Sequence, residues 1–224
     1  TGWSWNFGDP SSSPNNISSL QNPSHWFSAS GTYTVTLIVN SNSGCADTIS
    51  QIINVQPSPL ANFSATQVCF GNNTFFNDSS SISSGTISWN WNFGDPLSAP
   101  NNTSTLQNPS HYYGAAGNYT LTLVVTSNFG FNDTLTHVIF VAPRPLADFG
   151  AINVCQGSQI FFTDSSTIPF GNIVSWNWAF GDATNSTQQN PSHLYFSPGT
   201  YNVTLIVTSG LGCTDTITKQ IIVH

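Results

Sequence analysis

Three sequence blocks recur in the same order along the chain, and this repetition constrains the fold more than any other feature. The first block reads GWSWNFGDP, SWNWNFGDP and SWNWAFGDA in its three copies, the second begins NPSH, and the third is an alternating run such as GTYTVTLIV. Equivalent residues lie about 85 positions apart, a spacing that is too long for a solenoid unit and suits a small independent domain. The repeated positions include Trp5, Trp91 and Trp178, His25, His111 and His193, and Tyr33, Tyr119 and Tyr201.

Two proline-containing segments, VQPSPLANF and VAPRPLADF, separate the repeats. Pro-x-Pro resists both helix and central strand and favours a short, stiff, extended linker. We therefore place complete repeats at 57–142 and 143–224 and a partial repeat, which lacks its first two strands, at 1–56. We expect the sequence to be a mature or internal piece, with the missing strands upstream of Thr1 or replaced by another segment that covers the open edges.

Each complete repeat is predicted to fold as an immunoglobulin-like β-sandwich. Apolar and polar residues alternate with a period of two in segments such as TYTVTLIVN, which is typical of half-buried strands. Turns rich in Gly, Asn, Pro and Asp divide each repeat into about seven short strands. That number of strands in about 85 residues predicts an all-β chain of tandem sandwiches.

The aromatic block is interpreted as core. Trp89, Trp91 and Phe93 are spaced two residues apart and share one face of a strand, and burial of each ring stabilises the fold at about 25 cal/mol per Å². An exposed stripe that stacks on sugars is the alternative. We predict the same core role for the equivalent residues Trp5, Trp178, Tyr33, Tyr119 and Tyr201.

A Gly-Asp pair follows each aromatic block and is predicted to end the strand in a turn. Glycine allows an unusual backbone conformation, and a short carboxylate accepts nearby backbone N–H groups. The turn residues are Asp9, Asp95 and Asp182.

The composition excludes several classes of partner. Charged residues make up 5% of the chain, the net charge is −7, and the only cations are Arg144 and Lys219. Binding to nucleic acid or to an anionic membrane needs clustered Lys and Arg, which are absent. No apolar run approaches the roughly 18 residues of a membrane-spanning helix.

No residue pattern predicts catalysis. Each repeat contributes one NPSH histidine, and single histidines about 85 residues apart do not assemble a site within one domain. The chain has no Glu for a carboxylate pair with Asp and no glycine-rich phosphate loop. We interpret His25, His111 and His193 as structural turn residues.

At the residues quoted above, the chain resembles the polycystic-kidney-disease (PKD) domain family, whose signature is W-x-F-G-D-G, then N-P-x-H-x-Y, then G-x-Y-x-V-x-L-x-V. The resemblance covers essentially the whole chain. Some family members bind calcium near such acids, but two departures weaken a calcium site here, so we expect no cofactor. Pro or Ala replaces the Gly after Asp, and Asn or Ala replaces the frequent Asp after Trp, at Pro10, Pro96, Ala183, Asn6, Asn92 and Ala179.

The sub-type is similar to the tandem repeats of large surface proteins in gliding, type IX-secreting bacteria, which carry VC-x-G early and GC-x-D late in one repeat. This resemblance, with disulfides favoured over metal in a secreted chain, implies a Cys155–Cys213 bridge. Phe131 stands where the late cysteine of the second repeat would be, so Cys69 is expected to be reduced and Cys45 to pair upstream of Thr1. A Cys45–Cys69 bridge remains the alternative.

Each repeat also contains Asp-Thr followed by Ile or Leu, similar to an O-glycosylation acceptor of the same bacterial group. The alternative is a turn at the start of a strand, in which Asp accepts backbone N–H groups, and both readings remain open. The threonines are Thr48, Thr134 and Thr216.

We expect a non-catalytic, extracellular spacer in a bacterial cell-surface adhesin or filament protein, whose partners are neighbouring repeats, copies of itself and, as a further candidate, a surface polysaccharide. One alternative is a filament subunit completed by strand addition. Another is a carbohydrate-binding accessory module of a secreted hydrolase, for which solvent exposure of the candidate aromatics is the discriminating observation. These candidates are Trp26, Tyr112 and Phe170.

Overall fold

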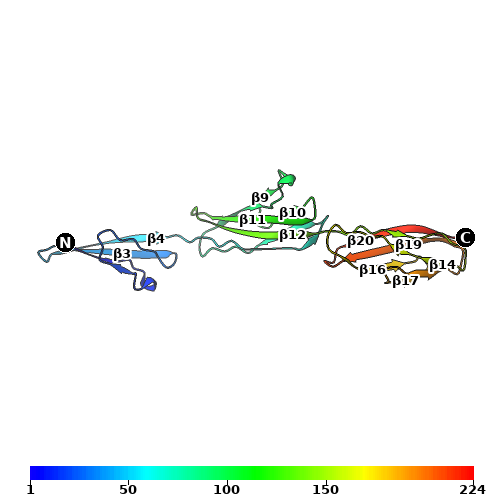
Figure 1. Ribbon diagram of the computed structural model, residues 1–224. Helices are drawn as coiled ribbons and strands as arrows, with labels where there is room; N and C mark the ends of the chain where they lie inside the picture. Colours follow the sequence, from blue (N-terminus) through cyan, green and yellow to red (C-terminus); the bar gives the residue numbers. More distant parts are fainter.

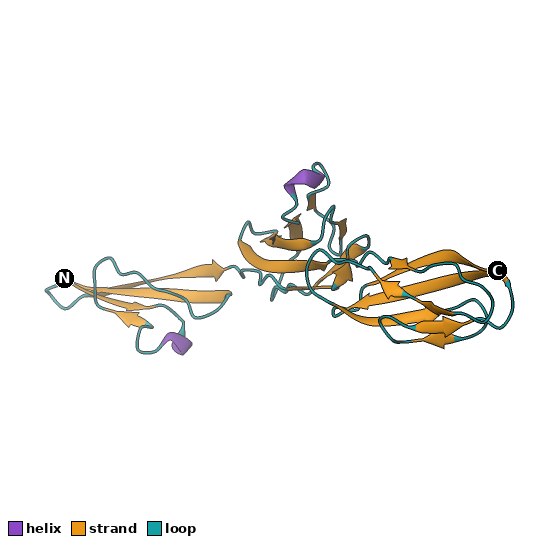
Figure 2. Ribbon diagram, turned by 45° about the vertical axis from the view of Figure 1, so that its right-hand side comes forward, coloured by secondary structure: helices purple, strands orange, loops and turns teal.

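The computed structural model describes all 224 residues and arranges the three repeats end to end in one extended row, with the termini at opposite ends (Figure 1). Strands dominate every repeat, and the helices are two single turns on protruding loops (Figure 2). The predicted all-β, immunoglobulin-like architecture is confirmed. No helix is long and apolar enough to cross a lipid bilayer.

The first repeat is a single antiparallel sheet with the strand order β2-β1-β3-β4. Its central pairing aligns Trp5 with Leu37, and its hairpin aligns Tyr33 with Ile53. No second sheet faces it. The elements are β1 (Gly2–Asn6), the 3₁₀ helix η1 (Pro10–Ser12), β2 (Ile17–Ser18), β3 (Gly31–Asn40) and β4 (Ala46–Val55).

The second repeat is a complete sandwich of eight strands. A sheet ordered β10-β7-β5 faces a sheet ordered β6-β12-β11-β8-β9, in which the β6–β12 pair is parallel. The elements are β5 (Phe63–Ala65), β6 (Val68–Cys69), β7 (Asn73–Asp78), β8 (Ile87–Asn92), η2 (Pro96–Ser98), β9 (Thr103–Ser104), β10 (Ser110–Tyr112), β11 (Gly117–Ser127) and β12 (Asn132–Ala142).

The third repeat has the same layers with one strand interrupted. Its main sheet is ordered β17-β16-β19-β20, and the strand pairs β13-β15 and β14-β18 form the other layer. The buried Phe162 lies between β14 and β15, which together replace β7. The elements are β13 (Phe149–Gly150), β14 (Gln159–Phe161), β15 (Thr163–Asp164), β16 (Ile173–Ala179), β17 (Asn185–Ser186), β18 (Ser192–Leu194), β19 (Gly199–Ser209) and β20 (Thr214–Val223).

In both complete repeats, the second tryptophan of the aromatic block lies at the centre of the core. Trp91 is fully buried, because Phe63 and Phe76 from the first strands pack against it with ring centroids 5.3 and 5.7 Å away. Trp178 is fully buried in the same way. Trp5 is only half-buried, since the first repeat has no equivalent strands to cover it. Tyr33, Tyr119 and Tyr201 are also half-buried.

The glycine after each aromatic block is required by a close approach of two backbones. Gly94 has a φ of +71°, and a Cβ placed there would lie 2.2 Å from the carbonyl oxygen of Thr120 on β11. Gly8 is held in the same way against Thr34. A side chain at either position would push the turn away from the strand and lift the following aspartate out of its site.

We expect Trp178→Ala to lower the free energy of unfolding of the third repeat by about 3–5 kcal/mol, because the change leaves a cavity in a closed core. Trp5→Ala should cost less, since its ring already contacts solvent. Trp26→Ala is the matched control: its ring is 89% exposed, and the expected change is within about 0.5 kcal/mol. Hydrogen exchange resolved by repeat measures all three variants. An equal cost for Trp5→Ala and Trp178→Ala would contradict the assigned burial.

Candidate functional site

An aspartate and a histidine meet at the end of the aromatic strand in every repeat, and the aspartate is buried in the first two. The Nε2 atoms of His25 and His111 lie 3.3 and 3.2 Å from the Oδ2 atoms of Asp9 and Asp95. In the third repeat the corresponding distance is 2.7 Å, between His193 and Asp182. The Gly-Asp turn and the NPSH segment, separate in sequence, thus form one feature.

Each histidine ring lies inside a column of aromatic rings. His111 stacks on Phe93 with centroids 4.5 Å apart and meets Tyr113 edge to face. Tyr113 packs in turn against Tyr119 at 4.1 Å, and its hydroxyl donates to the carbonyl oxygen of Phe93. The same column runs through Phe7, His25, Phe27 and Tyr33 and through Phe180, His193, Tyr195 and Tyr201.

Hydrogen bonds hold two of the carboxylates in their charged form. The pKa of Asp9 is lowered by the hydroxyl and the backbone N–H of Ser28, which outweigh the opposing effect of burial. For Asp182, burial opposes ionisation, but hydrogen bonds from Thr184 and His193 outweigh it and the net pKa is lowered. Asp9 and Asp182 thus accept backbone N–H groups as predicted, whereas the carboxylate of Asp95 contacts the His111 ring.

The tyrosines beside the pairs keep their protons. Burial raises the pKa of Tyr113 and of Tyr195, so both phenols act as hydrogen-bond donors at neutral pH. Tyr195 donates to the carbonyl oxygen of Phe180. The polar atoms of the column therefore bond to one another and to the backbone.

The Asp–His pairs are contacts that hold the aromatic columns of the repeats in place. Each lies in a different repeat, and no group of three or more His, Cys, Asp or Glu side chains converges on a metal-binding arrangement. Asn92 accepts from the backbone N–H of Gly94 and from the side chain of Asn102. This amide fixes the turn through neutral hydrogen bonds.

The aromatics proposed as sugar-binding residues are exposed, but each lies alone. Trp26 is 89%, Tyr112 50% and Phe170 42% exposed. Trp26 and Tyr112 are equivalent positions of neighbouring repeats, whereas Phe170 lies in another loop and packs against Phe140 of the second repeat at 6.0 Å. They form no shared planar surface within a repeat.

One open groove adjoins the Asp–His pair of the second repeat. It lies between the loop that carries η2 and the segment around Tyr112, and Leu97, Leu106 and His111 also line it. In the third repeat the chain from Asp182 to Asn190 is five residues shorter than the equivalent segment. The groove therefore depends on a variable loop.

The Asp-Thr motif has a structural role in both complete repeats. Asp133 accepts the backbone N–H of Ala61, and Asp215 accepts that of Ala147, each at 2.8 Å. The motif thus ties the last strand of the sandwich to its first strand. The adjoining Thr48, Thr134 and Thr216 are exposed, and their modification stays a prediction.

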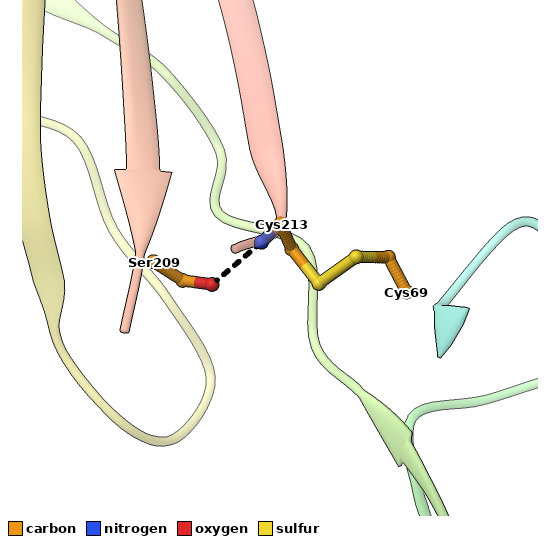
Figure 3. The surroundings of a disulfide bond; sticks show 3 residues. All are labelled: Cys69, Ser209 and Cys213. Carbon is orange, nitrogen blue, oxygen red and sulfur yellow. Dashed lines mark hydrogen bonds between the residues drawn. A yellow bond between two sulfur atoms is a disulfide. The ribbon is translucent and has the colours of Figure 1, made fainter. Parts of the chain in front are cut away.

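The predicted Cys155–Cys213 disulfide is wrong. Cys213 bonds to Cys69 of the preceding repeat, with Cα atoms 5.6 Å apart (Figure 3), while Cys155 and Cys45 are free and exposed. Cys69 is therefore not reduced, and the alternative Cys45–Cys69 bridge is also wrong. The bond joins two domains.

Strand length explains why the predicted pairing fails. Cys213 directly precedes β20, whereas Val154, next to Cys155, pairs with Val223 at the other end of that strand. Ten residues of strand span roughly 33 Å, far beyond the Cα separation of about 7 Å that a disulfide allows. Early and late cysteines therefore lie at opposite ends of a repeat, and the distal end of one repeat meets the proximal end of the next.

The sequence contained part of the information needed to predict the Cys69–Cys213 bond. The GC turn directly opens the last strand, so its position at one end could be predicted from the alternating pattern. The parallel β6–β12 pairing that brings Cys69 to Ala142 at the other end is a long-range contact, which no local pattern reveals. The Asp–His contact was missed for the same reason.

A family model described as PKD domain matches residues 1–57, 54–141 and 142–223. A microbial collagenase of Vibrio alginolyticus is 46% identical over 66 residues, which cover 30% of this chain and 8% of the collagenase. The pre-pro-metalloprotease PrtV of Vibrio cholerae is 30% identical over 146 residues, which cover 65% of this chain and 15% of the metalloprotease. The chain thus spans a small part of these relatives.

Two solved structures are also similar to parts of this chain or to all of it. The PKD1 domain of Vibrio cholerae metalloprotease PrtV is 36% identical and covers 36% of this chain and 96% of that domain, with a TM-score of 0.33. The N-terminal eight Ig domains of Down Syndrome Cell Adhesion Molecule are 15% identical and cover all of this chain and 33% of that one, with a TM-score of 0.54. The second likeness concerns the fold alone.

We expect Asp182→Asn to remove a pH-dependent part of the stability of the third repeat. The folded pKa is depressed, so near and below the unfolded value of about 3.9 the unfolded state binds more protons. The contribution of the carboxylate is thus present at neutral pH and lost as the pH falls through its folded pKa. Urea unfolding between pH 7 and pH 2 should show the difference between wild type and variant shrinking toward acid.

The control for that measurement is Asp47→Asn, which removes an exposed carboxylate on β4 that accepts only the N–H of Thr48. A pH-independent difference for Asp182→Asn would contradict the assigned hydrogen bonds.

Peptide mapping without reductant should recover a Cys69 peptide joined to a Cys213 peptide, with two thiols open to alkylation. In Cys69→Ser, three thiols should react, because Cys213 loses its partner while both repeats keep their separate cores. A linked Cys155–Cys213 peptide would contradict the connectivity.

Proposed function

This chain belongs to the PKD domain family as three tandem members, and from that premise we propose that it is a non-catalytic extracellular spacer, part of the stalk of a large cell-surface adhesin or filament protein. Its role is to hold other parts of such a protein at a distance. The observation that carries the proposal is the end-to-end row of repeats with a covalent bond across one junction.

The second junction of the row has the features of a stiff spacer. The Cys69–Cys213 bridge and the Phe140–Phe170 contact both restrain the third repeat against the second. Since the linker between the domains is short and contains Pro143 and Pro145, bending at this junction is opposed by both chain and side chains.

The fold uses its reactive groups internally, which suits a passive role. Trp91 and Trp178 are core, each NPSH histidine is paired, and the turn carboxylates accept hydrogen bonds from their own repeat. With 5% charged residues, the surface offers few groups whose interactions depend on salt. A spacer of this kind keeps its shape over a range of ionic conditions.

The disulfide supports an extracellular location, because such bonds persist in oxidising compartments. Exposed Thr48, Thr134 and Thr216 would be accessible to O-glycosylation on a surface protein. Sugar at these positions would lie on strand residues that face solvent, so it would not disturb the core.

A second candidate is an accessory module of a secreted protease or other hydrolase. The similar segments of the Vibrio collagenase and of PrtV favour it, and so do the exposed ring of Trp26 and the groove beside Tyr112. In that role the chain would attach an enzyme to a polymer.

Small-angle scattering and a binding assay together separate the two functions. A spacer should give the scattering of an elongated particle. It should not be retained by collagen fibres, cellulose or chitin. An accessory module should be retained by one of them, and Trp26→Ala or Tyr112→Ala should weaken retention by about tenfold, since a stacked ring contributes roughly 1–2 kcal/mol. A compact particle, or retention lost on these substitutions, would overturn the spacer proposal.

A further inference from the structure

The loop around the free Cys155 has the same backbone structure as the loop around the bonded Cys69. Val68 pairs in parallel with Val141 at the end of its repeat, and Val154 pairs in parallel with Val223. The backbone N–H two residues after each valine is held in the same way. Phe70 donates to the carbonyl oxygen of Ala142, and Gln156 donates to the carbonyl oxygen of His224, both at 2.7 Å. In both loops the cysteine carbonyl accepts from the residue three positions on, at 3.1 Å.

The turn around the free Cys45 likewise matches the turn around the bonded Cys213. Both follow the pattern Ser-x-x-Gly-Cys. The N–H of each cysteine donates to the hydroxyl of the serine four residues earlier, at 3.1 Å, and the N–H of that serine donates to the cysteine carbonyl, at 2.8 Å. The serines are Ser41 and Ser209. Each free cysteine is therefore held as one half of a bond that the same structure shows complete elsewhere.

The free cysteines Cys155 and Cys45 lie at opposite ends of their repeats, as the bonded Cys69 and Cys213 do. The observed bridge runs from the distal end of the second repeat to the proximal turn of the third. Cys155 lies at the distal end of the third repeat and Cys45 at the proximal turn of the first. Cys213 is 1% exposed where a neighbouring repeat contacts it, whereas the free cysteines are exposed.

Apolar side chains accompany the thiol at the distal end. Ile222, which is 41% exposed, is equivalent to Phe140, the residue that packs against Phe170 across the second junction. Phe196 is 81% exposed, and its carbonyl accepts from the side chain of Gln156, next to Cys155. The end of the third repeat thus presents both elements of the observed junction, a thiol and an apolar contact.

We propose that Cys155 is a disulfide attachment site whose partner is the Ser-x-x-Gly-Cys turn of another PKD-type repeat docked end to end, and that the Cys45 turn is the matching half. The inference rests on the proposed spacer function and names its partner. A docking contact of this kind does not close on itself, so it extends the row in one direction.

The bond forms by thiol–disulfide exchange. The thiolate of Cys155 attacks a small disulfide such as oxidised glutathione, forming a mixed disulfide and releasing one reduced glutathione. The thiolate of the incoming turn then attacks the Cys155 sulfur and releases the second. Two thiols lose two protons and two electrons, and one oxidised glutathione becomes two reduced molecules.

Two variants of the full chain test the proposal, with a second copy of this chain as the probe. Cys45→Ser keeps only the Cys155 half, Cys155→Ser keeps only the Cys45 half, and both retain the Cys69–Cys213 bridge as an internal control. Mixed at equal concentration in a glutathione redox buffer, they should form the Cys155–Cys45 heterodimer about tenfold more than either homodimer, because docking raises the effective concentration of the matched thiols. Mass spectrometry of size-marked chains counts the products.

A statistical mixture of products, or no heterodimer, overturns the proposal. The scattering test of the spacer function uses single chains, so a failure there and a failure here are distinguishable.

Discussion

Each repeat depends on a column of stacked rings that an Asp–His pair fixes at one end. A phenylalanine of the aromatic strand stacks on the histidine, and the histidine bonds to the aspartate that ends the same strand. The column is complete even in the first repeat, which has only one sheet. It therefore forms from the aromatic strand, the NPSH segment and the strand that follows, and the first strands of a repeat serve mainly to bury the tryptophan beside it.

The two junctions of the row differ in strength, with consequences for its mechanics. Between the second and third repeats, a disulfide and an aromatic pair span the junction. Between the first and second, Ser30 meets Ser83 at 3.3 Å, and Phe131 occupies the turn position that Cys213 has one repeat later. A row of similar domains thus combines a covalently fixed joint with a weaker polar one.

All three repeats keep the same aromatic column, whereas the residues and loops beside it differ. The groups that stabilise a repeat are therefore separate from those that a binding partner would contact. The position after the buried histidine is Trp26, Tyr112 and Leu194 in the three repeats, and it lies outside the column. The loop beside it changes length without disturbing the Asp–His contact, since only its two ends enter the core. A binding surface could therefore appear on one repeat without a change in the others.

The sequence by itself determined the repeats, the strands, their inward faces and the fold class, because these follow from local periodicity and turn residues such as Gly94. It left the role of Asp-Thr open, and in the complete repeats this aspartate bonds to a backbone N–H about 70 residues away. Only the tertiary structure decided that Asp95 pairs with His111, that Trp5 stays half-covered and that Cys69 bonds Cys213. Each of these depends on which segments, distant along the chain, lie at the same end of a strand some 30 Å long. The spacing of residues along the sequence does not predict which end of a strand they occupy, because that depends on how the strands pair.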